Sequence, residues 1–465
     1  MDDSSNASTP EPAHSDARQN DGPAAGLRAL ASRFFADYGM LAVLLLLVVF
    51  FSVVTYERRQ PVGAEAADAV AARVAREAGP AGHVLVIARA SEQDAAFAAR
   101  LETLLKSQGV ASVARAEGEP RDIRATMEQR VAAGEKTDVI ATTERNAFIV
   151  DKLRSRVAGY GDTRVVVPEG YGWPVFLRSD NLLNVANQIV VIAIIAIGMT
   201  MVIITGGIDL SVGSLIALSA VTTATLIGKL GGADASGAAM FGSAVAAILC
   251  CGVVGLFSGV MVSRFRMPPF IATLGMMLVA SGLAYIVSGG ESIYQIPDRF
   301  VWLGRGTTLV GIPNAVLLMI GLYAIAYIVM SRMTLGRYVY AVGGNVEAAR
   351  LSGVSVGSIL LFVYALSGMM AGLGGVVLSS QLKSGAPTYG LMYELYVIAA
   401  VVLGGTSLAG GKGKVIGSLI GALIIGVIQN GMNLTGVESY TQKVVLGLGI
   451  LGAVRLDPLR RKDYR

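Results

Sequence analysis

Charged side chains are scarce in this chain: Asp, Glu, Lys and Arg make up 15% of its 465 residues, whereas 53% are hydrophobic. Soluble domains carry about 25% charged residues, so this deficit indicates a membrane protein. Cysteine and histidine occur only twice each. Cys250 and Cys251 are adjacent in an apolar run, where no disulfide framework can form, and His14 and His83 belong to no metal-ligand cluster. Neither disulfide nor metal chemistry is expected.

Nucleic-acid binding and nucleotide binding are not indicated either. The net charge is only +5, and the Lys and Arg residues gather at the ends of apolar segments rather than in one basic patch. The glycine-rich stretch Ala399–Gly417 (AAVVLGGTSLAGGKGKVIG) does not fit the Walker A pattern, because Thr406 stands five residues before Gly411, and Gly413 follows Lys412. We predict a tight turn there, no ATP site and no cofactor. No nucleophile–base pair indicates an enzyme.

Composition divides the chain into regions. Residues 1–37 lack apolar periodicity and are rich in Ser, Asp, Pro and Ala, which predicts a disordered tail. The apolar run 38–56 is long enough to cross a bilayer and longer than a signal-peptide core, so it predicts an uncleaved first transmembrane helix. Residues 57–178 are a soluble insertion, 179–456 form a transmembrane core, and 457–465 form a short tail.

The insertion alternates short β-branched runs with amphipathic helical stretches, a pattern typical of a small α/β domain with a parallel, Rossmann-like sheet. No Gly-x-Gly-x-x-Gly motif follows its first strand, so nucleotide binding is not supported. Three roles stay open: a docking or spacing module for a partner, a ligand-sensing lobe, and a fold without a ligand role. The expected strands are His83–Ala88, Val110–Val113, Asp138–Ala141 and Arg164–Val167.

Apolar segments follow one another through the remainder of the chain. Together with the first helix they give about ten transmembrane spans, so the fold class is an all-α polytopic membrane protein with an inserted extracytoplasmic α/β domain. The expected spans after the insertion are 186–206, 211–229, 238–262, 270–288, 313–330, 358–379, 393–405, 415–430 and 441–455.

The basic residues between these spans follow the positive-inside rule if both termini are cytoplasmic. The loops around 230–237, 380–392 and 431–440 would then lie outside and contain little positive charge, although Arg299 and Arg305 occupy a longer outer loop. The same parity places the insertion outside the cytoplasm. The basic residues of the cytoplasmic side are Arg264, Arg266, Arg332, Arg337, Arg350, Lys412, Lys414, Arg455, Arg460, Arg461 and Lys462.

One motif joins the second and third spans. The segment Gly198–Ala217 reads GMTMVIITGGIDLSVGSLIA: an apolar helix meets a glycine pair and then Asp209, and restarts at Ser211. Glycines allow the backbone to turn, and Asp209 or Ser211 can cap the next helix. A carboxylate between apolar spans indicates a functional site. The alternative is a cap at the cytoplasmic surface, where water lowers the cost of the charge.

A second motif lies in a predicted cytoplasmic loop, where 335–356 reads LGRYVYAVGGNVEAARLSGVSV. Asn345 can cap a short helix that starts at Val346 or Glu347, and Gly353 can end it. Such a polar helix suits a cytoplasmic partner, and the alternative is a solvated connecting loop. Elsewhere, Glu394 opens a span and is predicted to be an interfacial charge rather than a path residue.

Three runs together carry a family resemblance: GMTMVIITGGIDLSVGS, GRYVYAVGGNVEAARLSG and VVLGGTSLAGGKGKVIG. In this order they resemble the permease subunits of ribose-type ABC importers. The resemblance covers the first span and residues 179–456. This sequence differs from the family pattern in two respects: 354–357 lacks the proline of the general importer coupling pattern, and 57–178 stand where the family has a short loop.

The resemblance implies a sugar importer of the bacterial inner membrane, built on a homodimer of permeases in the lipid bilayer. It implies a cytoplasmic ABC ATPase subunit and a periplasmic sugar-binding protein as partners. The segment implied to meet the ATPase comprises Gly344, Asn345, Glu347, Ala348, Ala349, Arg350, Leu351, Ser352 and Gly353. The residues implied to lie near the translocation path or its gate are Thr205, Gly206, Gly207, Asp209, Ser211 and Ser214.

Two other classes of function compete with this interpretation. A secondary transporter would work without an ATPase and would need intramembrane acids, for which Asp209 is the candidate near the middle of the chain. A membrane-bound sensor would use the external α/β domain, and would need a cytoplasmic signalling domain for which the two tails offer no candidate.

Overall fold

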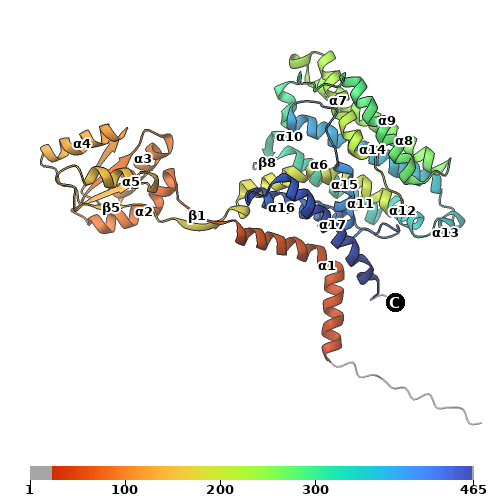
Figure 1. Ribbon diagram of the computed structural model, residues 1–465, viewed down its shortest axis with the longest axis horizontal. Helices are drawn as coiled ribbons and strands as arrows, with labels where there is room; N and C mark the ends of the chain where they lie inside the picture. The colour runs from red at the N-terminus through yellow and green to blue at the C-terminus, as the bar shows by residue number, and fades with distance from the viewer. Residues whose placement is uncertain (1–22, 310, 463–465) are drawn as a thin grey trace, which may run out of the picture. The chain divides into compact units, whose positions relative to one another are not determined.

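The computed structural model describes residues 23–309 and 311–462 (Figure 1). The chain divides into two compact units, which we describe separately. Ser52–Leu177 form one unit, called here the insertion unit. The chain up to Phe51 and the chain from Arg178 onward form the other, called here the helical unit.

The insertion unit contains a four-stranded parallel sheet in the order β3-β2-β4-β5. The observed β2 coincides with the strand predicted from the sequence, whereas β3 starts two residues later than predicted and β4 one residue later. The bounds are β2 (His83–Ala88), β3 (Ser112–Glu117), β4 (Val139–Thr142) and β5 (Arg164–Val166).

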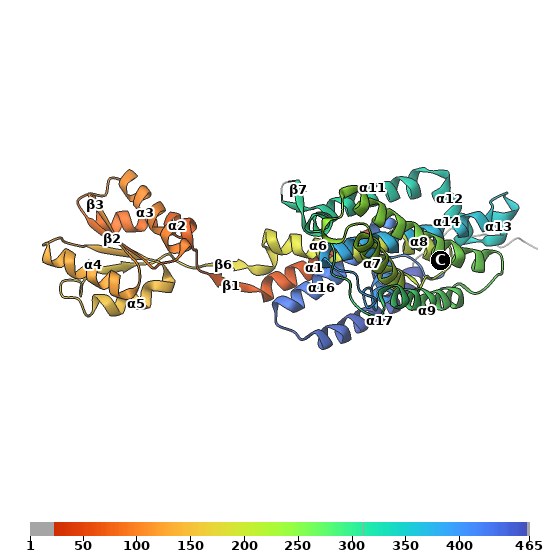
Figure 2. The ribbon, with the colours of Figure 1, turned by 90° about the horizontal axis from the view of Figure 1, so that it is seen from above.

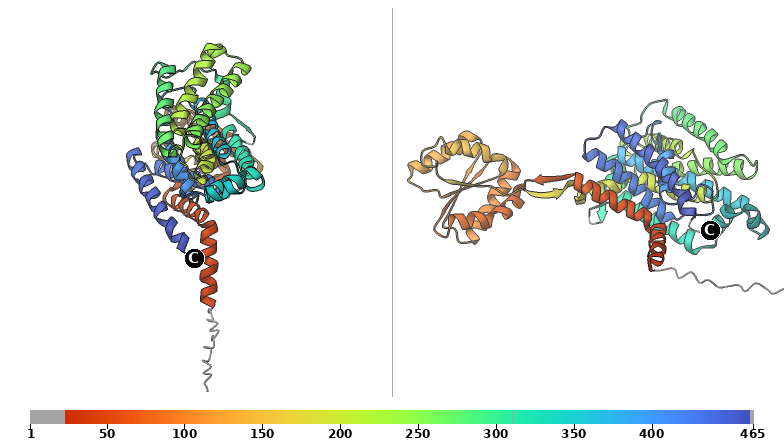
Figure 3. Two further views of the ribbon diagram at one scale, coloured as in Figure 1. Left: turned by 90° about the vertical axis from the view of Figure 1, so that its right-hand side faces the viewer. Right: turned by 60° about the horizontal axis from the view of Figure 1, so that its bottom comes forward.

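Helices cover both faces of this sheet (Figures 2 and 3). The buried residues of β2 alternate between two apolar clusters, since successive side chains of a strand point to opposite faces. One cluster holds Leu101 of α3, and the other holds Met127 of α4. The helix bounds are α2 (Gly63–Ala78), α3 (Glu92–Ser107), α4 (Pro120–Ala132) and α5 (Glu144–Arg154).

A two-stranded antiparallel ribbon, which the sequence patterns did not predict, contains the first and last strands of the insertion unit. It pairs β1 (Tyr56–Arg59) with β6 (Tyr171–Pro174), and a short 3-10 turn, Val175–Leu177, follows β6. Next to the ribbon, the Phe176 backbone N–H donates to Thr55 Oγ1 at 3.1 Å. Both strands are short and neither is β-branched, so their sequences carry little strand signal.

The first helix of the helical unit differs from the prediction. The expected disordered tail covered 1–37, but α1 (Pro23–Val54) already begins at Pro23. Leu27, Leu30 and the alanines around them are strong helix formers, which explains why the helix starts before the apolar run. The remainder of the expected tail, 1–22, lies outside the described residues.

Seven helices of the described residues are long and apolar enough to cross a membrane. Two shorter apolar helices, Gly39–Val54 and Tyr393–Leu403, correspond to two further expected spans. The last expected span falls within α17 (Ser439–Lys462), so the predicted count of ten is not confirmed. The seven are α6 (Ser179–Ile204), α7 (Val212–Lys229), α8 (Gly237–Ser263), α9 (Pro269–Ser288), α11 (Asn314–Arg332), α14 (Val356–Leu382) and α16 (Val415–Leu434).

Helix α14 packs against α6, α7 and α8, and small residues let the backbones approach closely. A Cβ atom at Gly255 of α8 would stand 2.3 Å from the Tyr364 carbonyl oxygen of α14. A Cβ at Gly368 would stand 2.3 Å from the Cys251 carbonyl oxygen. The glycine-rich composition therefore reflects helix contacts that no larger residue would permit.

The shorter elements gather at the two ends of the bundle, with α13 at the end opposite to α10 and the β7–β8 hairpin (Figures 1 and 2). Helix α14 returns from the α13 end and is followed by α15. The bounds are η2 (Gly232–Asp234), η3 (Asp298–Val301), α10 (Trp302–Arg305), β7 (Thr307–Leu309), β8 (Ile312–Pro313), α12 (Thr334–Gly344), α13 (Val346–Leu351) and α15 (Tyr393–Leu403).

Candidate functional site

Three turns that are far apart in the sequence meet at the α13 end of the helical unit. They are the turn after α6 at Thr205–Gly207, the end of α12 at Gly343, and the glycine turn at Gly410–Gly411. The Gly411 backbone N–H donates to the Ile204 carbonyl oxygen at 2.8 Å. We call this meeting point the glycine junction. It connects the motif of Asp209 with the segment that leads into α13.

Only glycine fits at the centre of the glycine junction. A Cβ at Gly343 would stand 1.7 Å from the Ile204 carbonyl oxygen and 2.7 Å from the Gly411 nitrogen. Gly206 and Gly411 have φ angles of +81° and +72°, a region that other residues enter at a cost. At Gly344 a Cβ would meet no atom within 4 Å, so the requirement is local.

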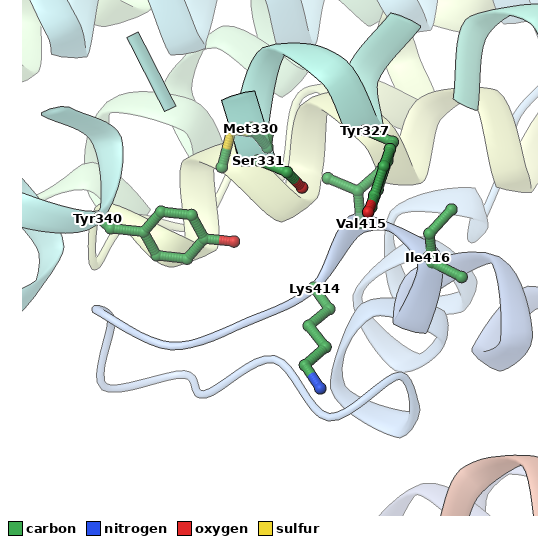
Figure 4. A pocket seen from close by; sticks show the side chains of 7 residues that line it. All are labelled: Tyr327, Met330, Ser331, Tyr340, Lys414, Val415 and Ile416. Carbon is green, nitrogen blue, oxygen red and sulfur yellow. The ribbon is translucent and has the colours of Figure 1, made fainter. Parts of the chain in front are cut away.

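A cavity of about 340 Å³ lies beside the glycine junction, between α11, α12 and the start of α16 (Figure 4). The Tyr340 hydroxyl donates to the Gly413 carbonyl oxygen at 2.7 Å, which ties α12 to the glycine turn. Figure 4 shows the hydroxyls of Ser331 and Tyr340 directed into the space, whereas the Lys414 side chain extends away from it. None of the residues that the sequence analysis assigned to a site lines this cavity.

Asp209 lies in the turn between α6 and α7 and is fully buried. Its Oδ1 accepts from the Ser211 N–H at 3.0 Å and from the Ser211 hydroxyl at 2.6 Å, and its Oδ2 accepts from the Ser367 hydroxyl of α14 at 2.8 Å. Burial raises the pKa of this carboxyl above its usual range, and the three hydrogen bonds oppose that shift. Asp209 thus bonds to the backbone just before α7, as the cap alternative requires, but protein groups rather than water surround its side chain.

Tyr364 of α14 reaches the same turn. A Cβ at Gly207 would stand 2.3 Å from its hydroxyl oxygen. This hydroxyl is buried and has no hydrogen-bond partner among the residues that the structure describes. A buried hydroxyl without a hydrogen bond costs free energy. A water molecule, or another conformation of the turn, could supply the hydrogen bond that this hydroxyl lacks.

Helix α13 agrees with the sequence prediction. The Asn345 side chain accepts from the Ala348 N–H at 2.9 Å, and Gly353 adopts the predicted helix-ending conformation with φ +82°. Glu347 and Arg350 are exposed and form an ion pair at 3.1 Å. Leu351 is 88% exposed, which is unusual for so large an apolar side chain. The helix thus presents an apolar tip beside a charged pair.

The loop expected at 380–392 corresponds to non-helical chain between α14 and α15, and part of this chain is buried. In this segment Ser384 and Ala386 are buried, and a Cβ at Gly385 would stand 2.5 Å from the Ala220 carbonyl oxygen of α7. A Cβ at Gly390 would stand 2.3 Å from the Gly213 carbonyl oxygen, near the start of α7. The chain therefore runs along α7 without helical structure, and we call it the interrupted segment, Lys383–Met392. Non-helical backbone beside a span is tolerated where it is buried or lines a cavity.

A second cavity, of about 260 Å³, lies between α7, α9 and the interrupted segment. Ser214, one of the residues assigned to the path or gate, lines it, whereas Thr205 and Asp209 do not. Glu394, which the sequence predicted to be an interfacial charge, also lines it. Two features of the sequence could have indicated this non-helical segment and its cavity. One is Gly385, and the other is the short apolar run after Glu394, which forms a helix of only 11 residues.

No group of three or more His, Cys, Asp or Glu that could hold a metal ion occurs within residues 23–309 and 311–462. The site regions combine glycine turns and hydroxyls with the carboxylates of Asp209, Glu347 and Glu394, and with the cations of Arg350 and Lys414.

Comparison with known proteins assigns the family. The family described as "Branched-chain amino acid transport system / permease component" matches residues 181–454. The ribose import permease protein RbsC of Escherichia coli strain K12 is 46% identical over 289 residues, covering 61% of this chain and 87% of that protein. RbsC of Bacillus subtilis strain 168 is 44% identical over 286 residues, covering 61% and 86%.

The D-allose transport system permease protein AlsC of E. coli strain K12 is 39% identical over 287 residues, covering 62% of this chain and 86% of that protein. No solved structure matches the chain. The match over residues 181–454, together with relatives at 39–46% identity, shows that the chain belongs to the permease subunits of ribose-type ABC importers.

Proposed function

We propose that this chain is the membrane-spanning subunit through which a bacterial ABC importer moves a monosaccharide, or a related small polar solute, across the inner membrane. Two copies would form the pathway, and a separate ATPase would supply the energy. The relatives named for ribose and allose support a monosaccharide.

The observation that carries the mechanism is the glycine junction. Gly343, at the end of α12, abuts the Ile204 carbonyl oxygen, and α13 follows directly after α12. A displacement of α13 by the ATPase would therefore move the turn at Thr205–Gly207 and the start of α7. Such a displacement requires that the ATP-bound ATPase contacts the two conformations of the permease differently. Thr205, Gly206, Gly207, Asp209 and Ser211 act as the gate in this proposal.

The surface proposed to contact the ATPase is α13 with its flanks. Leu351 would enter an apolar pocket of the partner, and Glu347 with Arg350 would form its polar rim, the usual anatomy of a protein interface. The remaining residues of the surface are Gly344, Asn345, Ala348, Ala349, Ser352 and Gly353. Both termini would then be cytoplasmic and the insertion unit extracytoplasmic, as the parity of the spans and the positive-inside rule predict.

Since the parity of the spans predicts that the insertion unit is extracytoplasmic, it would share the periplasm with a sugar-binding protein. Docking or spacing of that protein is the role we propose for it, and ligand sensing and a fold without a ligand role are the alternatives. Deleting the unit while retaining the α1 and α6 helices separates these roles. Loss of binding-protein capture with intact ATPase capture supports docking, and unchanged capture of both contradicts it.

A pull-down from detergent-solubilised native membranes, followed by mass spectrometry, tests the partners. We expect the wild-type chain to capture an ATPase subunit and a sugar-binding protein. Leu351→Asp should lose the ATPase and keep the sugar-binding protein. Leu309→Asp is the matched control, because Leu309 is also exposed but lies in β7 at the opposite end of the bundle. Capture of neither partner by the wild type, with solute movement in ATPase-free liposomes, would favour a secondary transporter instead.

A further inference from the structure

We propose that the cavity beside the interrupted segment is a sugar-recognition site within the permease, where the Glu394 carboxylate accepts hydrogen bonds from adjacent hydroxyls of the passing sugar. This inference rests on the proposed function and adds a selectivity step in this subunit, separate from the binding protein.

The absence of a side chain at one position of α7 makes room for the carboxylate. A Cβ at Gly213 would stand 2.1 Å from Glu394 Oε2 and 2.7 Å from the Gly390 carbonyl oxygen. Within the described residues, the only group that donates a hydrogen bond to this carboxylate is its own backbone N–H. A partly buried carboxylate without a cation or side-chain donor is costly unless another molecule hydrates it or donates to it. Sugar hydroxyls are suitable donors.

Five of the thirteen other lining residues carry hydroxyls or aromatic rings, and the remaining eight are apolar side chains or glycines. Ser214 and Ser281 face the cavity from α7 and α9, and Thr388 faces it from the interrupted segment. Tyr285 and Tyr389 add aromatic rings, and the Tyr389 hydroxyl forms a hydrogen bond with Ser384, which orients its ring. Such groups can donate to or accept from a sugar, or pack against its C–H face. The volume, about 260 Å³, lies below the range of roughly 300–1,000 Å³ for drug-sized ligands, so it suits a single monosaccharide.

The local charge favours neutral sugars over acidic ones. Neither the first turns of α7, nor α9, nor the segment from Ser384 to Tyr393 contains a charged residue, so Glu394 determines the charge of the cavity. Lys383, the neighbouring cation in the sequence, pairs with Asp298. A sugar phosphate or a sugar acid would bring a second negative charge close to an unneutralised carboxylate. A neutral polyol would replace water on the carboxylate with its own hydroxyls.

The backbone holds Glu394 in place through an unusual conformation. Met392 has a φ angle of +69°, although it is not glycine, and Gly390 has +75°. Strained residues of this kind persist where the surrounding structure fixes them, and they cluster at functional sites. Met392 immediately precedes α15, and both Met392 and Glu394 line the cavity. Interrupted spans with helix starts at the substrate are a known design of transport proteins.

The test uses the complete importer, reconstituted in liposomes with its ATPase and binding protein. Uptake is measured for the sugar that the binding protein carries, for analogues that lack one hydroxyl, and for the phosphorylated sugar. We expect Glu394→Ala to reduce uptake of the parent sugar at least about tenfold, the effect of losing one charged hydrogen bond of 1.5–3 kcal/mol. Glu394→Ala should also reduce the difference in uptake between the parent sugar and the deoxy analogues. Uptake by Glu394→Gln should lie between that of the wild type and that of Glu394→Ala.

Glu291→Gln is the matched control, because Glu291 is an exposed carboxylate outside the cavity, and it should behave as wild type. If Glu394→Ala fails to assemble with the ATPase, Ser214→Ala provides the test at the same cavity and should weaken discrimination between the sugar and its deoxy analogues. The recognition site would be overturned if the Glu394 variants took up sugar at the wild-type rate and discriminated against deoxy analogues as the wild type does. Where Ser214→Ala replaces them, the same result for that variant would overturn it. In either case the importer function would stand. A wild-type complex that moves no sugar with ATP would overturn both.

Discussion

The two units of this chain are held together by different means. In the insertion unit, residues such as Leu101 and Met127 form an apolar core around a sheet, and ion pairs cover its surface. In the helical unit, backbones approach through glycines, and buried polar groups such as Asp209 bond to hydroxyls. Water drives the burial of apolar surface only in the first case, since lipid is itself apolar. The helical unit must therefore depend on close packing and satisfied polar groups.

The largest effect in this comparison is expected at the glycine junction. Gly343→Ala places a methyl group 1.7 Å from the Ile204 carbonyl oxygen, so the backbones of α12 and the α6 turn must separate. Overpacking of this kind costs about 1–3 kcal/mol or more, and it should abolish ATP-driven uptake. Gly321→Ala in α11 is the control, because its added methyl group would meet no atom within 4 Å and Gly321 belongs to no assigned site. Equal uptake by the two variants, at equal amounts in the membrane, would contradict the role of the junction.

A charge reversal on α13 should act on coupling and leave the fold intact. Glu347 is exposed, and Glu347→Lys removes its ion pair with Arg350. We expect uptake to fall about tenfold or more through weakened ATPase contact, with an unchanged melting temperature of the purified chain. Uptake and binding-protein-stimulated ATP hydrolysis are the two measurements. Normal uptake by this variant would remove α13 from the coupling surface.

In the insertion unit, a cavity in the core should reduce stability without touching the gate. Leu101 is fully buried in α3, and Leu101→Ala should destabilise this unit by about 2–5 kcal/mol. Hydrogen exchange on the full-length chain should show faster exchange in α2, α3 and β2, and unchanged exchange in α6 and α14. Faster exchange in both units would show that they unfold together, contrary to the division described above.

The smallest effect is expected for a surface ion pair of the same unit. Arg100 and Asp68 lie 2.9 Å apart, and both side chains are about half exposed. Water and salt screen such a pair, so Arg100→Ala should change the free energy of unfolding by only about 0.2–1 kcal/mol. Thermal denaturation in low and high salt measures this. A larger loss than that of Leu101→Ala would reverse the proposed order of contributions.

The sequence predicted the elements that depend on local signals. The strand at His83–Ala88, the cap by Asn345 and the end of α13 at Gly353 all follow from side chains within a few residues, and the structure agrees with them. Hydropathy located most spans because a membrane helix needs a long apolar run. The sequence did not predict the start of α1 at Pro23. The composition of residues 1–37, rich in Ser, Asp, Pro and Ala, indicated disorder in spite of the helix-forming residues after Pro23.

Contacts between distant segments could not be predicted from the sequence. Nothing near Gly343 indicates that it abuts Ile204, and nothing near Glu394 indicates that Gly213 leaves room for its carboxylate. Asp209 was recognised as unusual, but its bond to Ser367 of α14 depends on how two helices pack. Tertiary packing decides these features, so one sequence contains no local signal for them.

Uptake in a defined system tests the central claim most directly. Proteoliposomes would contain the full chain with its ATPase, and would be supplied with the binding protein and a radiolabelled monosaccharide. The account predicts uptake that requires ATP, stops with a hydrolysis-defective ATPase, and is absent when the permease is omitted. Uptake that continues at the same rate without the ATPase would contradict it, and a secondary transporter would then be the better description of this protein.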